Sequence, residues 1–387
     1  MPPLTGNCLN IVLQEDLTIR GGAQLWLMNC GTRLVAAGHK VTIILPSTSL
    51  LLEDLNDGQM TVETYNADEI AENPDAFKER FTSILKPAQV CVTLVRQQRG
   101  QFQNVNFIAS CIADADLKTQ LIAKTGTPDP TYKKYFYGGP LLDKNQCSVI
   151  TIAQYTKTFI VEHMGVPAEI ITNVYNGTDT TRFKRTPQMA VEAMKRYPCV
   201  EGAFVVGCIG SYEERKAQIV LLQAAKKLID DGRLPNIYCL LVGEGPDKAM
   251  LQEKIEEYNL EKNAVLCEFT KEPFYVYERC NLIALPSTGK EGLPNVLLEA
   301  LAMEKPCVAT RSYGMAEVVI DGKTGYCFPS GDVNALADAI VKIAHTSEEE
   351  QTQMSQNGKE LIFSEHDKAK QFEKILDIIK EKAAVAL

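Results

Sequence analysis

Two glutamates flank the start of one expected helix, and their spacing suits a ligand that is bound at both ends. Glu291 and Glu299 are separated by seven residues. A helix over residues 296–303 is expected because this stretch is rich in Leu, Ala and Glu. With about 3.6 residues per turn, Glu299 lies more than one turn inside this helix, and Glu291 stands before it. The residues that join Glu291 to the helix are Gly292, Leu293, Pro294 and Asn295.

The beginning of this helix is an expected anion site. Pro294 favours the first helical position, because its missing N–H is unpaired there anyway. The free N–H groups and the partial positive charge of a helix N-terminus attract phosphate. A ligand with phosphate at the helix end and hydroxyl-bearing groups on both sides would meet both glutamates. A nucleotide sugar has this composition, whereas two solvated glutamates on a surface helix are the simpler alternative.

The segment from Glu291 to Glu299 resembles the E-x7-E motif of retaining glycosyltransferases with the GT-B fold, the family 4 type (glycosyl transferases group 1). The resemblance extends over most of the chain. It includes the turn Asn176-Gly-Thr-Asp179 with Phe183, and the turn Gly243-Glu-Gly-Pro. It implies that Glu291 faces the donor sugar and is catalytic together with Lys216, and that Glu299 holds the ribose.

The resemblance also implies the remaining donor contacts. The family carries an Arg and a Lys that clamp the donor diphosphate. Lys216 matches the Lys, but Ser211 stands where the Arg is expected, so Arg215 is the candidate for the missing charge. Charge-assisted contacts to phosphate are the strong ones, and a lone lysine would bind weakly. The further donor-binding candidates are Ser211 itself, Gly21, Gly22, Gly243, Phe269, Thr270 and the residues before the helix, Gly292, Leu293, Pro294 and Asn295.

The acceptor side departs most from the family pattern. In the family, a strand of the first domain leads to a histidine that contacts the donor sugar. Here that strand leads to Lys124 and Thr125 with no histidine, and either of these two residues is a candidate for the contact. Arg96 and Arg99 follow another expected strand and are candidates for acceptor phosphate or a membrane head group, with a solvated loop as the alternative.

Strands and helices alternate along the chain, which predicts an α/β protein with two Rossmann-like domains facing across a cleft. The predicted domains are an acceptor-side domain, 1–185, completed by helix 365–387, and a nucleotide-sugar donor domain, 186–364. Residues 186–201 are polar, contain two prolines, and are expected to be an interdomain linker. Residues 359–387 are expected to be helical, and the resemblance implies that the last helix crosses back to the first domain.

The composition of the chain limits the classes of partner and cofactor that we expect. The net charge of −9 argues against a nucleic-acid binder. The twelve cysteines show no C-x-x-C spacing, so we expect a reducing compartment and neither a zinc nor a redox motif. Asp114-Ala-Asp116 spells the D-x-D of metal-dependent transferases, but it ends a helical pattern, and we expect no metal and no cofactor. Residues 1–8 lack the pattern of a signal peptide, so we expect a cytoplasmic protein, peripheral at the inner membrane face.

The predicted function is therefore transfer of a hexosyl group from a nucleoside-diphospho-sugar, with UDP as the carrier, to an acceptor hydroxyl. The resemblance implies retention of the anomeric configuration, independence of metal, and a place in polysaccharide or glycolipid synthesis. Two alternatives stay open. One is a nucleotide-sugar 2-epimerase, against which the scarcity of histidine counts. The other is a nucleotide-sugar-binding protein without transferase activity, which Ser211 and Ala217 favour.

Overall fold

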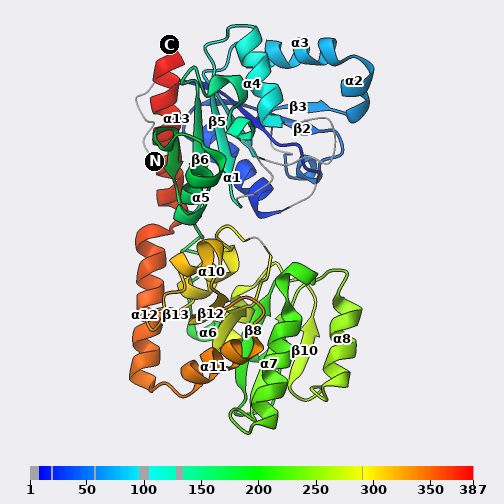
Figure 1. Ribbon diagram of the computed structural model, residues 1–387, viewed down its shortest axis with the longest axis vertical. Helices are drawn as coiled ribbons and strands as arrows, with labels where there is room; N and C mark the ends of the chain where they lie inside the picture. The colour runs from blue at the N-terminus through cyan, green and yellow to red at the C-terminus, as the bar shows by residue number, and fades with distance from the viewer. Residues whose placement is uncertain are drawn as a thin grey trace. The chain divides into compact units, whose positions relative to one another are not determined.

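The computed structural model describes residues 8–18, 21–55, 58–95, 104–127, 134–289 and 291–386 (Figure 1). The chain forms two compact units. Unit 1 comprises Met1–Val174 and Gln371–Leu387, and unit 2 comprises Tyr175–Lys370. The units divide at 174/175 and 370/371, whereas the boundaries were expected at 185/186 and 364/365. The division into an acceptor-side domain and a donor-binding domain at the expected boundaries remains a prediction.

Unit 1 contains a seven-stranded parallel sheet of order β3-β2-β1-β4-β5-β6-β7. Its strands are β1 (Asn10–Gln14), β2 (Lys40–Pro46), β3 (Thr61–Tyr65), β4 (Val90–Leu94), β5 (Gln120–Thr125), β6 (Cys147–Thr151) and β7 (Ile171–Asn173). Its α-helices are α1 (Gly22–Ala36), α2 (Ala67–Glu72), α3 (Pro74–Leu85), α4 (Asn104–Asp114), α5 (Gln154–Met164) and most of α13 (Lys368–Ala386).

Alternating side chains of β1 pack on opposite faces of this sheet. Ile11 and Leu13 join the core under α1 and α13, where Leu27 and Ile379 are fully buried. Val12 joins the core under α3, α4 and α5. Both faces of the sheet are therefore covered by helices, as expected for a buried parallel sheet.

Unit 2 contains a six-stranded parallel sheet of order β10-β9-β8-β11-β12-β13. Its strands are β8 (Phe204–Ile209), β9 (Ile237–Val242), β10 (Ala264–Cys267), β11 (Leu282–Leu285), β12 (Cys307–Thr310) and β13 (Gly325–Phe328). Its helices are α6 (Pro187–Arg196), α7 (Gln218–Asp230), α8 (Lys248–Glu257), α9 (Phe274–Arg279), α10 (Asn295–Ala302), α11 (Val333–Ala344) and α12 (Glu348–Glu365). Leu221 of α7 and Ile340 of α11 are buried in its largest core cluster.

The expectation of two Rossmann-like domains is confirmed, but three local expectations are corrected. Residues 186–201 are not a linker, because Pro187–Arg196 form helix α6, which packs on α9 within unit 2. The C-terminal stretch is two helices rather than one. They are separated at His366 and Asp367, where Thr178 pairs with Asp367 in a parallel bridge. Pro294 does not occupy the first helical position but precedes α10 with an extended backbone (ψ 129°).

None of the helices that the structure describes combines the length and the apolar composition required of a membrane span.

Candidate functional site

The arrangement of strands in unit 2 explains why two distant loops meet. Strands β8 and β11 are hydrogen-bonded neighbours and run in the same direction. The loops that follow them therefore emerge at the same carboxyl edge of the sheet, where ligands of open α/β folds bind. The backbone N–H groups of Thr288 and Gly289 donate to the carbonyl of Arg215, at 2.9 and 3.1 Å. The loop after β8 is thus fixed to the loop that leads to α10.

Glu291 is the centre of an ion-pair cluster between these loops. Its Oε1 accepts a hydrogen bond from Lys216 Nζ at 2.6 Å and another from Arg215 Nη1 at 2.9 Å. The side chains of Glu291 and Lys216 are only 11% and 13% exposed, whereas that of Arg215 is 44% exposed. The structure therefore brings three of the predicted residues together, although Glu291 lies 75 positions after Lys216 and 76 after Arg215 in the chain.

The cluster also contains Glu213, which is not among the residues predicted from the sequence. Glu213 accepts hydrogen bonds from Arg215 Nε at 3.0 Å and from Arg215 Nη2 at 3.1 Å, and the hydroxyl of Ser211 also donates to its carboxylate. Burial opposes ionisation of Glu213. The hydrogen bonds from Ser211 and Arg215 and the charges of Arg215 and Lys216 outweigh it and lower the pKa of Glu213. The only sequence signal was the run of charges at 213–216.

Gly243, which follows β9, packs closely against the loop that follows β8. A Cβ atom at Gly243 would lie 2.0 Å from the carbonyl oxygen of Gly210, which is a backbone clash. Tyr212 of the loop after β8 forms two further hydrogen bonds. Its N–H donates to the carbonyl of Glu244, and its hydroxyl donates to the carbonyl of Cys267 at 2.6 Å. Gly243 is thus required for packing the loops after β8 and β9 against each other.

The residues between Glu291 and α10 are largely buried. Gly292 and Leu293 are buried, and Asn295 is exposed. Asn176, the first residue of the turn 176–179, donates through Nδ2 to the side-chain oxygen of Asn295 at 3.0 Å. Residues 176–183 and the start of α10 are therefore connected within unit 2.

Glu299 lies on α10 and contacts a different set of side chains. Its Oε2 accepts a hydrogen bond from the hydroxyl of Tyr277 at 2.6 Å. Burial raises the pKa of Glu299 to about 7, while the Tyr277 hydroxyl and the positive charges of Arg182 and Lys368 act in the opposite direction. No hydrogen bond between Glu299 and the Glu291 cluster occurs among the residues that the structure describes. The two glutamates are not in one hydrogen-bonded group.

The other donor candidates occupy separate positions. Phe269 follows β10 and is 64% exposed, and the hydroxyl of Thr270 accepts from the N–H of Glu272 at 3.0 Å. Gly21 and Gly22 begin α1 in unit 1, where the carbonyl of Gly21 accepts from the N–H of Leu25. Their part in donor binding remains a prediction.

The acceptor candidates that are described lie at the carboxyl end of β5 in unit 1. Lys124 and Thr125 are both buried, and the ammonium of Lys124 lies 4.1 Å from the ring centroid of Trp26. Arg96 and Arg99 lie outside the described residues. The D-x-D carboxylate Asp114 forms an ion pair with Lys78 at 2.5 Å.

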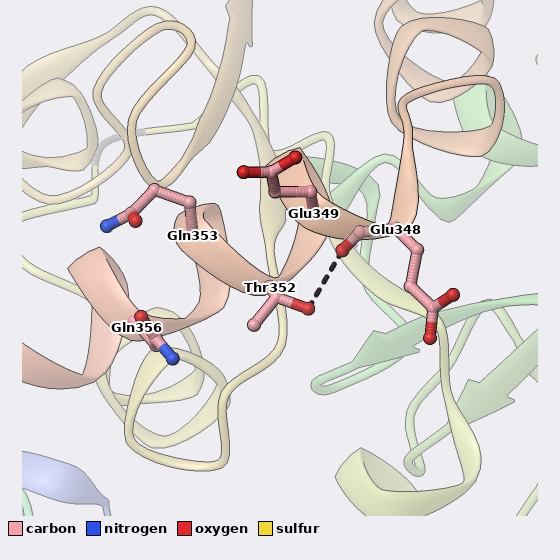
Figure 2. Close-up of a pocket in the computed structure, with 5 residues that line it drawn as sticks. All are labelled: Glu348, Glu349, Thr352, Gln353 and Gln356. Carbon is pink, nitrogen blue, oxygen red and sulfur yellow. Dashed lines mark hydrogen bonds between the residues drawn. The ribbon is translucent and has the colours of Figure 1, made fainter.

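A separate polar hollow lies on the first turns of α12 (Figure 2). The hydroxyl of Thr352 donates to the backbone carbonyl of Glu348 at 2.8 Å. The hollow shares no residue with the predicted site, and its lining consists of Glu348, Glu349, Thr352, Gln353 and Gln356.

Unit 2 is similar in sequence to a known protein family. Residues 190–361 match the family model of glycosyl transferases group 1. A GDP-mannose-dependent alpha-(1-6)-phosphatidylinositol monomannoside mannosyltransferase of Mycolicibacterium smegmatis is 30% identical over 205 residues, 51% of this chain and 53% of that protein. A lipopolysaccharide 1,2-N-acetylglucosaminetransferase of Salmonella typhimurium is 27% identical over 238 residues, 59% of this chain and 60% of that protein. The chain thus spans between half and two thirds of the length of these relatives.

Solved structures resemble the whole chain. The structure of Anabaena Alr3699/HepE in complex with UDP has a TM-score of 0.83 at 19% identity and covers 96% of this chain and 100% of that one. WaaG, a glycosyltransferase involved in lipopolysaccharide biosynthesis, has a TM-score of 0.67 at 17% identity and covers 95% of this chain and 99% of that one. At these identities the likeness establishes the fold. Residues 190–361, which lie in unit 2, are therefore similar to a glycosyl transferases group 1 domain, and the chain has the two-domain fold of the HepE and WaaG structures.

Proposed function

We propose that this protein is a retaining glycosyltransferase that moves a hexosyl group from a nucleoside-diphospho-sugar to an acceptor hydroxyl. The observation that carries the proposal is the cluster of Glu291, Lys216 and Arg215 at the carboxyl edge of the unit 2 sheet, directly before α10. It combines a hydroxyl-binding carboxylate with two cations that suit a diphosphate. The match of residues 190–361 to glycosyl transferases group 1 supports it.

In the proposed reaction, the charge that develops on the leaving diphosphate is stabilised by Lys216, by Arg215 and by the N-terminus of α10. Preorganised cations and helix N–H groups in a partly buried site are effective because they need no reorganisation during the reaction. Lys216 is only 13% exposed, so its charge is weakly screened by solvent. We therefore assign Lys216 the larger part of this stabilisation.

Glu291 orients the donor sugar by accepting hydrogen bonds from its hydroxyls, and Glu299 binds the ribose. The acceptor oxygen forms its bond to the anomeric carbon on the side from which the diphosphate leaves. The bond from that carbon to the phosphate oxygen breaks, and the hydroxyl proton passes to the diphosphate. No covalent sugar–enzyme intermediate and no metal ion are required in this proposal.

UDP is the proposed nucleotide, and the complexes of HepE with UDP and with UDP-glucose support it. The mannosyltransferase relative is named for GDP-mannose, so GDP-sugars are the necessary comparison. Relatives named for capsular polysaccharide and lipopolysaccharide synthesis support an acceptor that is a saccharide or glycolipid. Contact with the inner face of a membrane is part of the same proposal.

The test has two stages. Calorimetry with UDP, GDP and a panel of their sugar conjugates should identify one tightly bound donor, and turnover of that donor is then measured with a saccharide acceptor panel and with a chelator present. We expect Glu291→Ala and Lys216→Met each to lower kcat at least about a hundredfold, the effect typical of a lost electrostatic contact in the transition state. Lys248→Met, at a lysine that is 46% exposed, is the matched control.

One result would reject the role of Glu291, and two further results would reject the transferase. Unchanged kcat in Glu291→Ala removes Glu291 from the mechanism. Binding of a nucleotide sugar without turnover for any acceptor favours a binding protein. Conversion of the donor into its 2-epimer without an acceptor favours an epimerase.

A further inference from the structure

The guanidinium group of Arg215 is held along one edge and partly open along the other. Glu213 binds Nε and Nη2 with two nearly equal hydrogen bonds of 3.0 and 3.1 Å, and Glu291 binds Nη1 at 2.9 Å. An arginine carries five N–H donors. Three are occupied by these bonds, so two N–H groups have no partner among the residues that the structure describes. The side chain is 44% exposed, and these two donors can therefore meet a ligand.

Glu213 is itself fixed by the loop. Ser211 donates its hydroxyl to the carboxylate of Glu213, and the carbonyl of Ser211 accepts from the side chain of Gln218 at 2.9 Å. The backbone is extended at Glu213 and left-handed at Ala217 (φ 51°). The short turn between them places Arg215 two residues beyond Glu213, with its side chain folded back onto the Glu213 carboxylate.

Gly289 holds the other side of Arg215. A Cβ atom at this position would lie 2.5 Å from Cβ of Arg215, so the two segments are in direct contact. Arg215 is therefore confined between the Glu213 carboxylate and the loop that carries Glu291. A bidentate arginine–carboxylate pair adds geometric specificity as well as binding energy.

Given the charges of the cluster, Glu213 could either weaken or strengthen the binding of a diphosphate. Two glutamates and two cations face one another, so the cluster is close to neutral. If Glu213 only neutralised Arg215, it would weaken the binding of a diphosphate. If Glu213 fixes the guanidinium, it reduces the entropy lost when an anion binds, which strengthens binding.

We propose that Glu213 is a positioning residue, which holds the Arg215 guanidinium so that its two remaining N–H groups bind the diphosphate of the donor. This inference rests on the proposed function for its ligand class. It assigns Ser211 the task of fixing Glu213, in place of a direct contact with the donor. Lys216 supplies the second cation of the same diphosphate site.

From this geometry we expect Glu213→Gln to change the affinity for diphosphate in opposite directions with and without Arg215. In the wild-type background, Glu213→Gln loses one strong acceptor for Arg215 and should weaken diphosphate binding about tenfold, the effect of one charge-assisted hydrogen bond. In an Arg215→Ala background, the Glu213 carboxylate has no guanidinium to hold and only repels the ligand. There, Glu213→Gln should strengthen binding by a factor of two or more.

The experiment is isothermal calorimetry of the full chain with inorganic pyrophosphate and with UDP. It compares wild type, Glu213→Gln, Arg215→Ala and the double variant. Glu213→Asp is a further variant because it keeps the charge but shortens the side chain, so the two parallel bonds are lost; we expect it to weaken binding about as much as Glu213→Gln. Glu214→Gln, at the exposed neighbour, is the matched control and should change the affinity less than twofold.

Several outcomes would overturn the proposal. Tighter binding of Glu213→Gln in both backgrounds would make Glu213 a competitor of the ligand. Equal weakening in both backgrounds would show that Glu213 acts without Arg215, and wild-type affinity in Glu213→Asp would show that charge alone matters. Lack of wild-type binding to both probes at millimolar concentration would also reject it. The sign reversal with no sugar transfer from any donor would support the positioning role and reject the proposed enzyme.

Discussion

Replacing Glu299 by Gln should stabilise the protein at alkaline pH and have little effect at acid pH. Glu299 lies on α10, and its carboxyl accepts a hydrogen bond at 2.6 Å from the hydroxyl of Tyr277 on α9. Burial raises its pKa to about 7, from an ordinary value of 4.5. The folded state therefore retains a proton on Glu299 between pH 4.5 and pH 7 that the unfolded state has released.

The sign and size of the effect follow from this difference. Because the folded-state pKa is raised, wild-type stability falls as the pH rises through this window. One pKa unit corresponds to about 1.4 kcal/mol, so ionised Glu299 costs the folded state about 3 kcal/mol above pH 7. Glutamine does not titrate, so the free energy of unfolding of Glu299→Gln minus that of wild type should rise by about 3 kcal/mol between pH 4.5 and pH 8.

The assay is urea unfolding followed by far-UV circular dichroism at half-unit steps of pH. Trp26 is the single tryptophan and lies in unit 1, so its fluorescence follows that unit separately. Glu268→Gln is the control, because the Glu268 side chain is 77% exposed and its charge is solvated before and after unfolding. A difference between Glu299→Gln and wild type that stays constant from pH 4.5 to pH 8 would refute the reasoning.

Three further substitutions test other contacts of unit 2. Tyr277→Phe removes the donor that favours the ionised form of Glu299, so it should raise the pKa of Glu299 further; carboxyl titration by NMR measures this, and a lowered pKa would contradict it. Gly243→Ala should destabilise the protein by about 3 kcal/mol, because its Cβ would lie 2.0 Å from a backbone oxygen; an unchanged melting temperature would disprove the close packing. Arg185→Ala leaves the buried carboxylate of Glu278 without its two bonds, at 2.7 and 2.9 Å, and should cost about 1–2 kcal/mol, since Arg185 is itself 43% exposed; the urea midpoint should fall, and equal midpoints would count against this pair.

Much of the local structure could be predicted from the sequence. The helix expected over residues 296–303 forms at Asn295–Ala302, because its Leu, Ala and Glu residues favour a helical backbone. Strands alternating with helices also predicted two parallel sheets. The mistaken linker at 186–201 shows the limit of this approach. Its polar residues and prolines resemble a linker, yet Pro187 begins a helix whose stability comes from packing on α9.

By itself, the sequence determined which residue types are available for the chemistry: the two glutamates, the adjacent Arg215 and Lys216, and the loop before α10. Only the tertiary structure decided their partners. Glu291 meets both cations because β8 and β11 are neighbours in the sheet, whereas Glu299 pairs with Tyr277 and Glu213 clamps Arg215. Such contacts depend on strand order and on the turn of a loop, which bring together residues that no local pattern in the sequence connects.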